Sequence, residues 1–157
     1  MPPQLLYDIS TINLDKIVYD QEAIRNANPQ RGDMEHLNAI VYAEPSLGRI
    51  IGYKDVRPDE FWVEGHIPGR PLLPGVLMIE SGAQLASFYT RMFEKWKGFI
   101  GFGGVSDCKF RMQVAPGVRM YVVGQKIWER HHRICCNIQG VVAGSIVFEA
   151  AIIGTEM

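Results

Sequence analysis

The sequence predicts a single α+β domain in which an antiparallel sheet surrounds one buried helix. The chain has 157 residues, of which 47% are hydrophobic, and this is enough for one domain with a sizeable core. A helix predicted over residues 75–96 has apolar side chains nearly all the way round, which is typical of a buried helix. Most of the chain after residue 98 is rich in Val, Ile and Phe and is typical of strands. No repeat or linker divides the sequence, so we expect one domain over residues 1–157.

The first 36 residues have the weakest pattern and form an N-terminal extension. Within it, Asp20 is placed to cap a short helix over residues 21–28, which Pro29 would end. His36, at the end of the extension, is expected at the surface, because unpaired polar groups avoid the core. Two strands are then predicted over residues 39–43 and 48–54, around a turn at residues 44–46. A loop rich in Pro and Gly follows over residues 57–75.

The predicted strands after the helix complete the fold. They cover residues 99–105, 108–114, 119–129, 133–142 and 145–153, which gives six or seven strands in all. A single helix that is apolar on every side needs a sheet wrapped around it, and a long antiparallel sheet meets that need. We therefore expect the α+β hot dog fold, a long antiparallel sheet around one central helix.

Charge and composition argue against several classes of function. The chain has 16 basic and 17 acidic side chains and a net charge of −1, which gives no cationic excess for nucleic acid or for anionic lipid. No apolar run approaches the roughly 18 residues that span a bilayer, and the first residues do not have the pattern of a secretory signal. The three cysteines are an odd number without a framework spacing, which favours a reducing compartment and predicts a cytoplasmic protein.

The segment that joins the loop to the helix contains the chemistry-bearing residues. His66 lies in a loop that is stiffened by Pro68, Pro71 and Pro74. Glu80 falls in the second turn of the predicted buried helix, and Gln84, four residues later, is placed to hydrogen-bond its carboxyl group. Gly75 opens the helix, where free backbone N–H groups can receive a partly negative oxygen.

A histidine, a buried carboxyl group and a helix N-terminus suit acid–base chemistry next to a carbonyl group. The alternative from the residues alone is that His66 is an ordinary loop histidine and that Glu80 belongs to a structural ion pair. A zinc site at His131, His132, Cys135 and Cys136 is not favoured, because neighbours on a strand point to opposite faces. We expect no metal and no organic cofactor.

Residues 65–84 resemble the signature of the β-hydroxyacyl-[acyl carrier protein] dehydratases of the FabZ type. The chain reads Gly-His-Ile-Pro-Gly-Arg-Pro-Leu-Leu-Pro-Gly-Val-Leu-Met-Ile-Glu-Ser-Gly-Ala-Gln. The family pattern is roughly G-H-F-P-x-x-P-x-x-P-G-V-L-x-x-E-x-x-A-Q, so Ile67 alone departs from it. Residues 102–105, 109–111 and 115–117 resemble the later strands of the family. The resemblance extends over about residues 48 to 153.

The resemblance implies a role for each residue of the segment. It makes His66 the catalytic histidine and Glu80 the catalytic acid, with the Gly75 N–H polarising the thioester carbonyl and Gln84 supporting the carboxylate. The implied reaction dehydrates a (3R)-hydroxyacyl thioester to a trans-2-enoyl thioester. The family pattern also implies a homodimer, in some members a trimer of dimers, in which each site takes its histidine from one chain and its glutamate from the other.

The implied partner is acyl carrier protein, which is acidic. Basic side chains are therefore candidates for a docking patch. They are Arg70, Arg91, Lys95, Lys97, Lys109, Arg111 and Arg119.

The chain departs from the family before the first long strand. Residues 29–38 stand where the family has Pro-His-Arg-Tyr-Pro-Phe-Leu-Leu-Val-Asp, and only Pro29 and Arg31 are retained. Gln113 and Val118 also replace a usual Pro and Asp. Because the N-terminal stretch borders the acyl tunnel in the family, we expect the substrate range to differ more than the chemistry.

Two other functions compete with the dehydratase. A thioesterase of the same fold would use Glu80 to activate water, but the histidine loop favours the dehydratase. A non-catalytic acyl-binding or assembly subunit is a second alternative, against which His66 and Glu80 argue. An accompanying isomerase activity stays open, although Glu80 in place of Asp favours dehydration without isomerisation.

Overall fold

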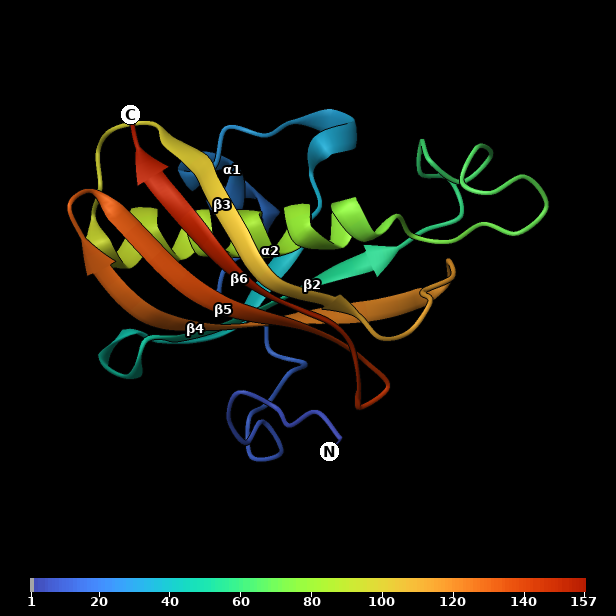
Figure 1. Cartoon of the computed structure of the whole chain (residues 1–157), viewed down its shortest axis with the longest axis horizontal. Helices are drawn as coiled ribbons and strands as arrows, with labels where there is room; N and C mark the ends of the chain where they lie inside the picture. The colour runs from blue at the N-terminus through green and yellow to red at the C-terminus, as the bar shows by residue number, and fades with distance from the viewer. Residues whose placement is uncertain (1) are drawn as a thin grey trace.

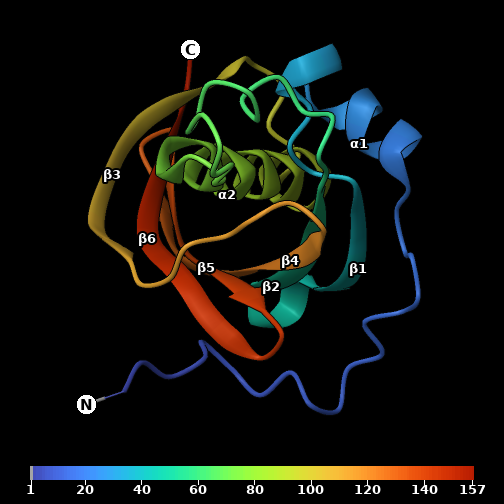
Figure 2. The same ribbon diagram turned by 90° about the vertical axis from the view of Figure 1, so that its right-hand side faces the viewer.

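A curved six-stranded antiparallel sheet wraps around one central helix in the computed structural model, which describes residues 2–157 (Figures 1 and 2). The strand order is β1-β2-β4-β5-β6-β3, so β1 and β3 form the two edges. The elements are α1 (Gln21–Ala27), β1 (Ala39–Glu44), β2 (Arg49–Val56), α2 (Gly75–Tyr89), β3 (Ile100–Phe110), β4 (Val118–Arg130), β5 (Arg133–Val142) and β6 (Ser145–Glu156). This arrangement confirms the predicted hot dog fold.

The central helix is shorter and less completely buried than the sequence predicts. Its α-helical part ends at Tyr89, and a wider π turn continues the chain over Thr90–Glu94. Lys95 then adopts a left-handed conformation, with φ of 58°, and ends the helical segment. Val76 in the first turn is 71% exposed, because the sheet covers the helix from one side and leaves its N-terminal end open.

The prediction of two separate strands over residues 99–105 and 108–114 is wrong, because a single strand, β3, covers most of this segment. The structure has one strand, β3, paired with β6, and the register shifts between Phe102 and Gly104 and between Ser106 and Lys109. A β-bulge absorbs extra residues without ending a strand, so β3 continues through both irregularities. The count is therefore six strands.

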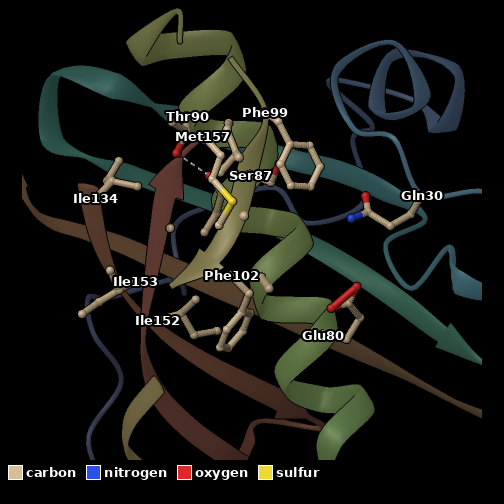
Figure 3. A pocket seen from close by; sticks show the side chains of 15 residues that line it. Gln30, Glu80, Ser87, Thr90, Phe99, Phe102, Ile134, Ile152, Ile153 and Met157 are labelled. Atoms are coloured by element: carbon tan, nitrogen blue, oxygen red, sulfur yellow. Dashed lines mark hydrogen bonds between the residues drawn. The ribbon is translucent and has the colours of Figure 1, made fainter. Parts of the chain in front are cut away.

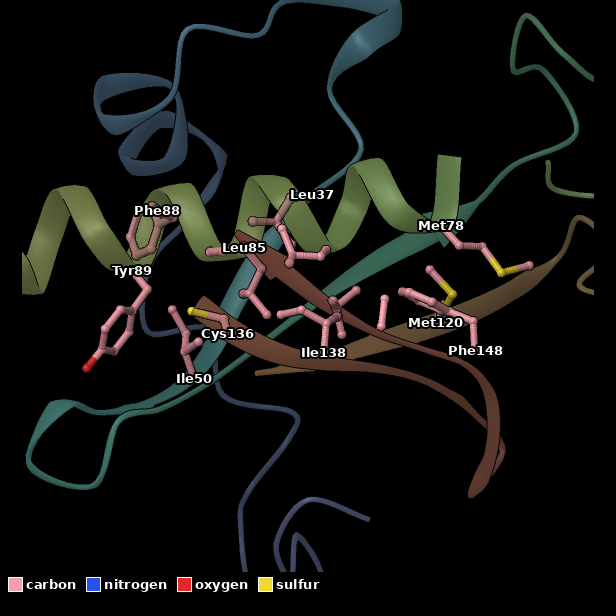
Figure 4. Packing of buried hydrophobic residues seen from close by; sticks show 14 of the residues in the cluster. Leu37, Ile50, Met78, Leu85, Phe88, Tyr89, Met120, Cys136, Ile138 and Phe148 are labelled. Atoms are coloured by element: carbon pink, nitrogen blue, oxygen red, sulfur yellow. The ribbon is translucent and has the colours of Figure 1, made fainter. Parts of the chain in front are cut away.

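The main core lies between α2 and the concave face of the sheet. Leu85 and Met78 are buried and point from α2 toward sheet residues that include Ile138 and Phe148 (Figure 4), whereas Phe88 packs against Tyr19. Burying a side chain of this size stabilises the fold by about 1.5–3 kcal/mol. Helix and sheet lie close together at Gly82, where an added Cβ would lie 2.8 Å from Cγ2 of Ile138.

The N-terminal extension covers part of the outer face of the sheet, which the sequence does not predict. The Tyr7 hydroxyl lies 3.1 Å from the carbonyl oxygen of Ile50 and 3.0 Å from that of Gly124. Tyr7 packs in a second apolar cluster with Ile51 and Val123. Burial raises the pKa of Tyr7 well above its usual range. Residues before β1 therefore belong to the folded domain.

Candidate active site

His66 is held by its own loop with one ring nitrogen available. Its backbone N–H donates to the carbonyl of Trp62 at 2.8 Å, and its carbonyl accepts the N–H of Leu72 at 2.8 Å. The Nδ1 atom lies 2.7 Å from the carbonyl oxygen of Leu72. Because a carbonyl can only accept, Nδ1 carries a hydrogen, and in the neutral ring Nε2 is then the nitrogen with the lone pair. The side chain is exposed, so Nε2 is open to a reacting group.

Gly75 stands at the N-terminus of α2, as the sequence predicts. The first backbone N–H groups of a helix have no partner within it and point toward the positive end of the helix dipole. A Cβ at Gly75 would lie 2.8 Å from the ring of Phe110, so a larger residue there would require that ring to move. The helix start therefore combines free donors with a close approach to β3.

The carboxyl group of Glu80 is oriented by Gln84, one turn further along α2. Gln84 Nε2 donates to Glu80 Oε1 at 3.1 Å and to the carbonyl of Met34 at 2.7 Å, and Gln84 Oε1 accepts the backbone N–H of His36 at 2.9 Å. These contacts leave the buried Gln84 amide only one orientation. Glu80 is half-buried rather than buried as the sequence predicts.

A cavity of about 310 Å³ runs beside α2 from Glu80 toward the C-terminal end of the helix (Figure 3). Its wall is mostly apolar and comes from α2, β3, β5, β6 and the segment before β1. Lining residues include Gln30, Ser87, Phe102, Ile152, Ile153 and Met157. The cavity therefore suits an apolar chain, with the Glu80 carboxyl group as an acidic group on its lining.

The single chain does not bring His66 into this cavity. No residue of the loop 57–74 lines it, and His66 is exposed while Glu80 faces the cavity. Glu80 and Gln84 are thus joined within one chain, whereas His66 is outside the cavity that Glu80 lines.

A buried polar cluster behind the site was missed by the sequence analysis. His36 is 1% exposed, so its predicted place at the surface is wrong. Lys54 Nζ lies 2.6 Å from Glu60 Oε1 and 3.1 Å from His36 Nδ1, and Glu60 Oε2 accepts the backbone N–H of Arg57 at 2.8 Å. The cluster ties β2 to the start of the loop that contains His66.

The protonation state of this cluster follows from its geometry. An ammonium group only donates, so His36 Nδ1 accepts from Lys54 and the imidazole is neutral. Burial, and then the charge of Lys54, lowers the pKa of His36 to about 4. Burial also lowers the pKa of Lys54, whereas contacts from Lys54 and the Arg57 N–H outweigh burial and lower that of Glu60. In β2, Lys54 is separated from Ile50 and Val56 by an even number of residues, so all three side chains point to the same inner face of the sheet. This spacing is the sequence signal that predicts a buried Lys54.

The structure gives several of the predicted docking residues local partners. Arg111 pairs with Glu149 at 2.5 Å, and Arg119 pairs with Asp55 at 2.7 Å while lying over the ring of Tyr53. The Arg91 guanidinium donates to backbone carbonyls of Trp96 and Gly98. Arg70 donates to Gln113 Oε1 at 2.7 Å, on the exposed side of the loop that contains His66.

Residues 2–157 contain no group of three His, Cys, Asp or Glu side chains arranged to hold a metal ion. Cys108, Cys135 and Cys136 are free thiols, and His132 Nδ1 lies 3.0 Å from Glu156 Oε1. In the same part of the chain, each helix is too short or too polar to cross a bilayer.

The fold and the helix-side cavity define a hot dog protein with a carboxylate on the lining of a mostly apolar cavity. A family model described as a FabA-like domain matches residues 28–151, and the chain belongs to this family. It is 33% identical over 138 residues to the 3-hydroxyacyl-[acyl-carrier-protein] dehydratase FabZ of Acetivibrio thermocellus, covering 85% of this chain and 94% of that protein. It is 44% identical over 95 residues to the FabZ of Clostridium novyi, covering 60% and 66%.

Solved structures share the fold at low sequence identity. The dehydratase heterocomplex ApeI:P from Xenorhabdus doucetiae superimposes with a TM-score of 0.71 at 12% identity, covering 85% of this chain and 90% of that chain. A hypothetical thioesterase with coenzyme A from Streptococcus pneumoniae superimposes with a TM-score of 0.58 at 8% identity, covering 75% and 84%. At such identities the superpositions establish the fold alone.

Proposed function

We propose that the chain is a FabZ-type dehydratase that converts (3R)-3-hydroxyacyl-[acyl carrier protein] to the trans-2-enoyl thioester in fatty acid or related acyl-chain biosynthesis. The observation that carries the proposal is the Glu80 carboxyl group, which Gln84 fixes on the lining of a mostly apolar cavity, in a chain of the FabA-like family. Relatives named FabZ across most of the chain support the same reaction.

The proposed mechanism divides the proton transfers between two side chains. His66 Nε2 takes a proton from carbon 2, and the electron pair forms the double bond as the bond from carbon 3 to its hydroxyl breaks. Glu80 gives the proton with which that hydroxyl leaves as water. The Gly75 N–H stabilises the negative charge on the thioester oxygen, by about 3 kcal/mol if it acts like other oxyanion donors.

We assign the second half of each site to another copy of the chain. The edge strand β3 exposes Phe102, Val105 and Phe110, which are 49%, 42% and 52% exposed. An unpaired edge with apolar side chains is a ready surface for strand pairing. A homodimer built on β3 would cover these side chains and let the His66 of one protomer meet the Glu80 of its partner. Sedimentation or light scattering tests the dimer, and a trimer of dimers would appear as a sixfold mass.

Acyl carrier protein is the proposed partner, and the cytoplasm the proposed location. Arg111 and Arg119 already pair with Glu149 and Asp55, so the remaining exposed candidates for an acidic partner are Arg70, Lys95, Lys97 and Lys109. Attraction of this kind weakens with salt. The free thiols of Cys108, Cys135 and Cys136 suit a reducing compartment.

The reaction is tested with purified protein and with (3R)-3-hydroxyacyl and trans-2-enoyl thioesters, by following enoyl absorbance. We expect turnover in both directions, and a loss of at least a hundredfold in His66→Ala and in Glu80→Gln. Undiminished turnover in either variant would reject its assigned role. Release of free thiol without enoyl product would identify the thioesterase instead, and binding without turnover would identify the acyl-binding subunit.

A further inference from the structure

The buried ion pair between Lys54 and Glu60 has no part in the proposed proton transfers. These two side chains are only 3% and 7% exposed. Moving two charges out of water is costly, and well-packed apolar side chains in place of a buried ion pair often leave stability unchanged or raise it. Stability is therefore a weak reason for such a pair. Charge-assisted hydrogen bonds, in contrast, are short and directional and fix the position of the groups they join.

Glu60 uses both oxygens of its carboxylate. Oε1 accepts a hydrogen bond from Lys54 Nζ at 2.6 Å, and Oε2 accepts the backbone N–H of Arg57 at 2.8 Å. Lys54 belongs to β2, and Arg57 is the first residue after that strand. The carboxylate therefore holds residues 57–60 against the end of β2 and fixes where the loop 57–74 begins.

Backbone hydrogen bonds connect this anchor to His66, six residues later. The Glu60 carbonyl accepts the N–H of Val63 at 3.1 Å, and the Trp62 carbonyl accepts the N–H of His66 at 2.8 Å. Trp62 is buried in the main core, whereas residues 64–70 are exposed. The place of His66 therefore depends on the residues that hold the loop at its two ends.

The other end of the loop has an anchor of its own. The Leu73 N–H donates to the carbonyl of Val114 at 2.7 Å, and His66 Nδ1 lies at the same distance from the carbonyl oxygen of Leu72. The imidazole of His66 thus bridges the two ends of the loop. A shift of the Glu60 end alone would break this bridge and free the ring to turn.

We propose that Lys54 and Glu60 are positioning residues, which hold His66 in the pose that it needs to take the proton from carbon 2. The inference rests on the proposed function, in which His66 is the base. A displacement of a reacting group by about 1 Å can lower a rate about a hundredfold. Loss of the pair should therefore leave a folded protein with a misplaced imidazole and a slow reaction.

Two variants remove the anchor in different ways. Glu60→Gln keeps the size of the side chain, but the amide has one acceptor atom and cannot accept from both Lys54 and Arg57. This variant leaves the contact between Lys54 and His36 in place, so its effect belongs to the loop. The double variant Lys54→Met with Glu60→Gln removes both charges, and so leaves no unpaired charge in the interior. Urea unfolding checks that each variant is folded.

The first readout is the tautomer of His66, which does not depend on the reaction. Nitrogen chemical shifts of the imidazole, measured at about pH 8 where histidine is neutral, show which ring nitrogen carries the hydrogen. We expect Nδ1 in the wild-type protein and a mixture of tautomers in both anchor variants. Lys126→Met is the matched control, because it breaks a pair with Glu94 beyond the opposite end of α2 and should keep the wild-type tautomer.

The second readout is steady-state hydration of an enoyl thioester. Both anchor variants should lose about tenfold to a hundredfold in kcat with KM within about threefold, because the cavity is lined by other residues. Lys126→Met should keep both constants. Should neither anchor variant fold, Glu60→Asp, which keeps the charge and shortens the side chain by one methylene group, is judged by the same two readouts.

The inference requires both changes in a folded variant. A mixture of tautomers in the wild-type protein, or anchor variants that keep either the wild-type tautomer or the wild-type kcat, would overturn it. A loss of stability alone would make the pair a structural contact only. If the wild-type protein does not hydrate the enoyl thioester, the proposed function fails, and the tautomer of His66 then decides separately whether the pair positions it.

Discussion

At the scale of single residues, the site depends on one amide. Gln84 makes three hydrogen bonds, two of them to the backbone of the segment before β1, and its remaining bond holds Glu80 Oε1. The backbone contacts fix which end of the amide faces Glu80. The carboxyl group is consequently held in place before any substrate arrives, which is what a general acid needs.

Replacing Gln84 by Met should reduce kcat more than it changes KM. The thioether keeps the volume but cannot donate, so Glu80 loses its orientation while the apolar cavity is retained. We expect kcat to fall about tenfold to a hundredfold with KM within about threefold, as measured by steady-state hydration of an enoyl thioester. Gln125→Met, at an amide that bonds backbone near residues 47–48, is the matched control and should leave both constants unchanged. A rise in KM alone would contradict the positioning role.

His36 should make stability depend on pH. Its pKa falls from 6.5 to about 4 on folding, so between these values the unfolded chain binds more protons than the native one. The neutral His36 therefore contributes fully to the free energy of unfolding above pH 6.5. This contribution, about 3 kcal/mol in total, is lost as the pH falls toward 4. Urea unfolding across this window should show a shallower loss in His36→Leu than in the wild-type protein. His66→Gln, at an exposed histidine, should keep the wild-type slope, and equal slopes in all three proteins would contradict the account.

The residues of the candidate site were predictable to the extent that they lie close in sequence. Spacing alone placed Gly75 at the helix start and Gln84 one turn after Glu80, and the structure has both. The place of His36 was not predictable from its neighbours, because its partner Lys54 lies 18 residues away and meets it only once β2 has paired in the sheet.

At the scale of elements, hydrophobic pattern located the strands and the helix but not their irregularities. The polar residues Ser106 and Asp107 lie at one of the bulges of β3 and look like a break between two strands in the sequence. In the structure, pairing with β6 continues through this bulge. The apolar residues Met92 and Phe93 continue the pattern of the helix into the π turn after Tyr89, which is why the predicted helix extended to Trp96. Strands β4 and β5 lie close to their predicted positions, because a clear turn separates them.

Gly82 should resist a substitution that normally stabilises a helix. Gly→Ala in a helix interior is usually favourable by up to about 1 kcal/mol. At Gly82 the added Cβ would lie 2.8 Å from Ile138 Cγ2 and 3.0 Å from Ile152 Cδ1, so helix and sheet must separate. We expect Gly82→Ala to lower the free energy of unfolding by about 1–3 kcal/mol in urea denaturation. Gly104→Ala, with no atom within 4 Å, is the control, and a stabilised Gly82→Ala protein would contradict the packing.

At the scale of the whole molecule, the faces of the sheet have different roles. The concave face holds α2, and the N-terminal extension lies across part of the outer face through Tyr7 and its neighbours. The edge strand β3 remains open and apolar, close to Gly75 through Phe110. A second copy at this edge is the arrangement that would complete the site, because a single chain leaves His66 outside the cavity of Glu80.

Mixing two inactive variants tests this arrangement most directly. His66→Ala and Glu80→Gln proteins, each of which we expect to be inactive alone, are unfolded together, refolded and assayed for hydration of an enoyl thioester. If each site joins His66 of one protomer to Glu80 of its partner, half of the dimers are mixed and each has one intact site. Random pairing then restores about a quarter of wild-type activity. If both groups act within one chain, no mixed dimer contains an intact site, and an inactive mixture that has refolded as dimers would contradict the shared site.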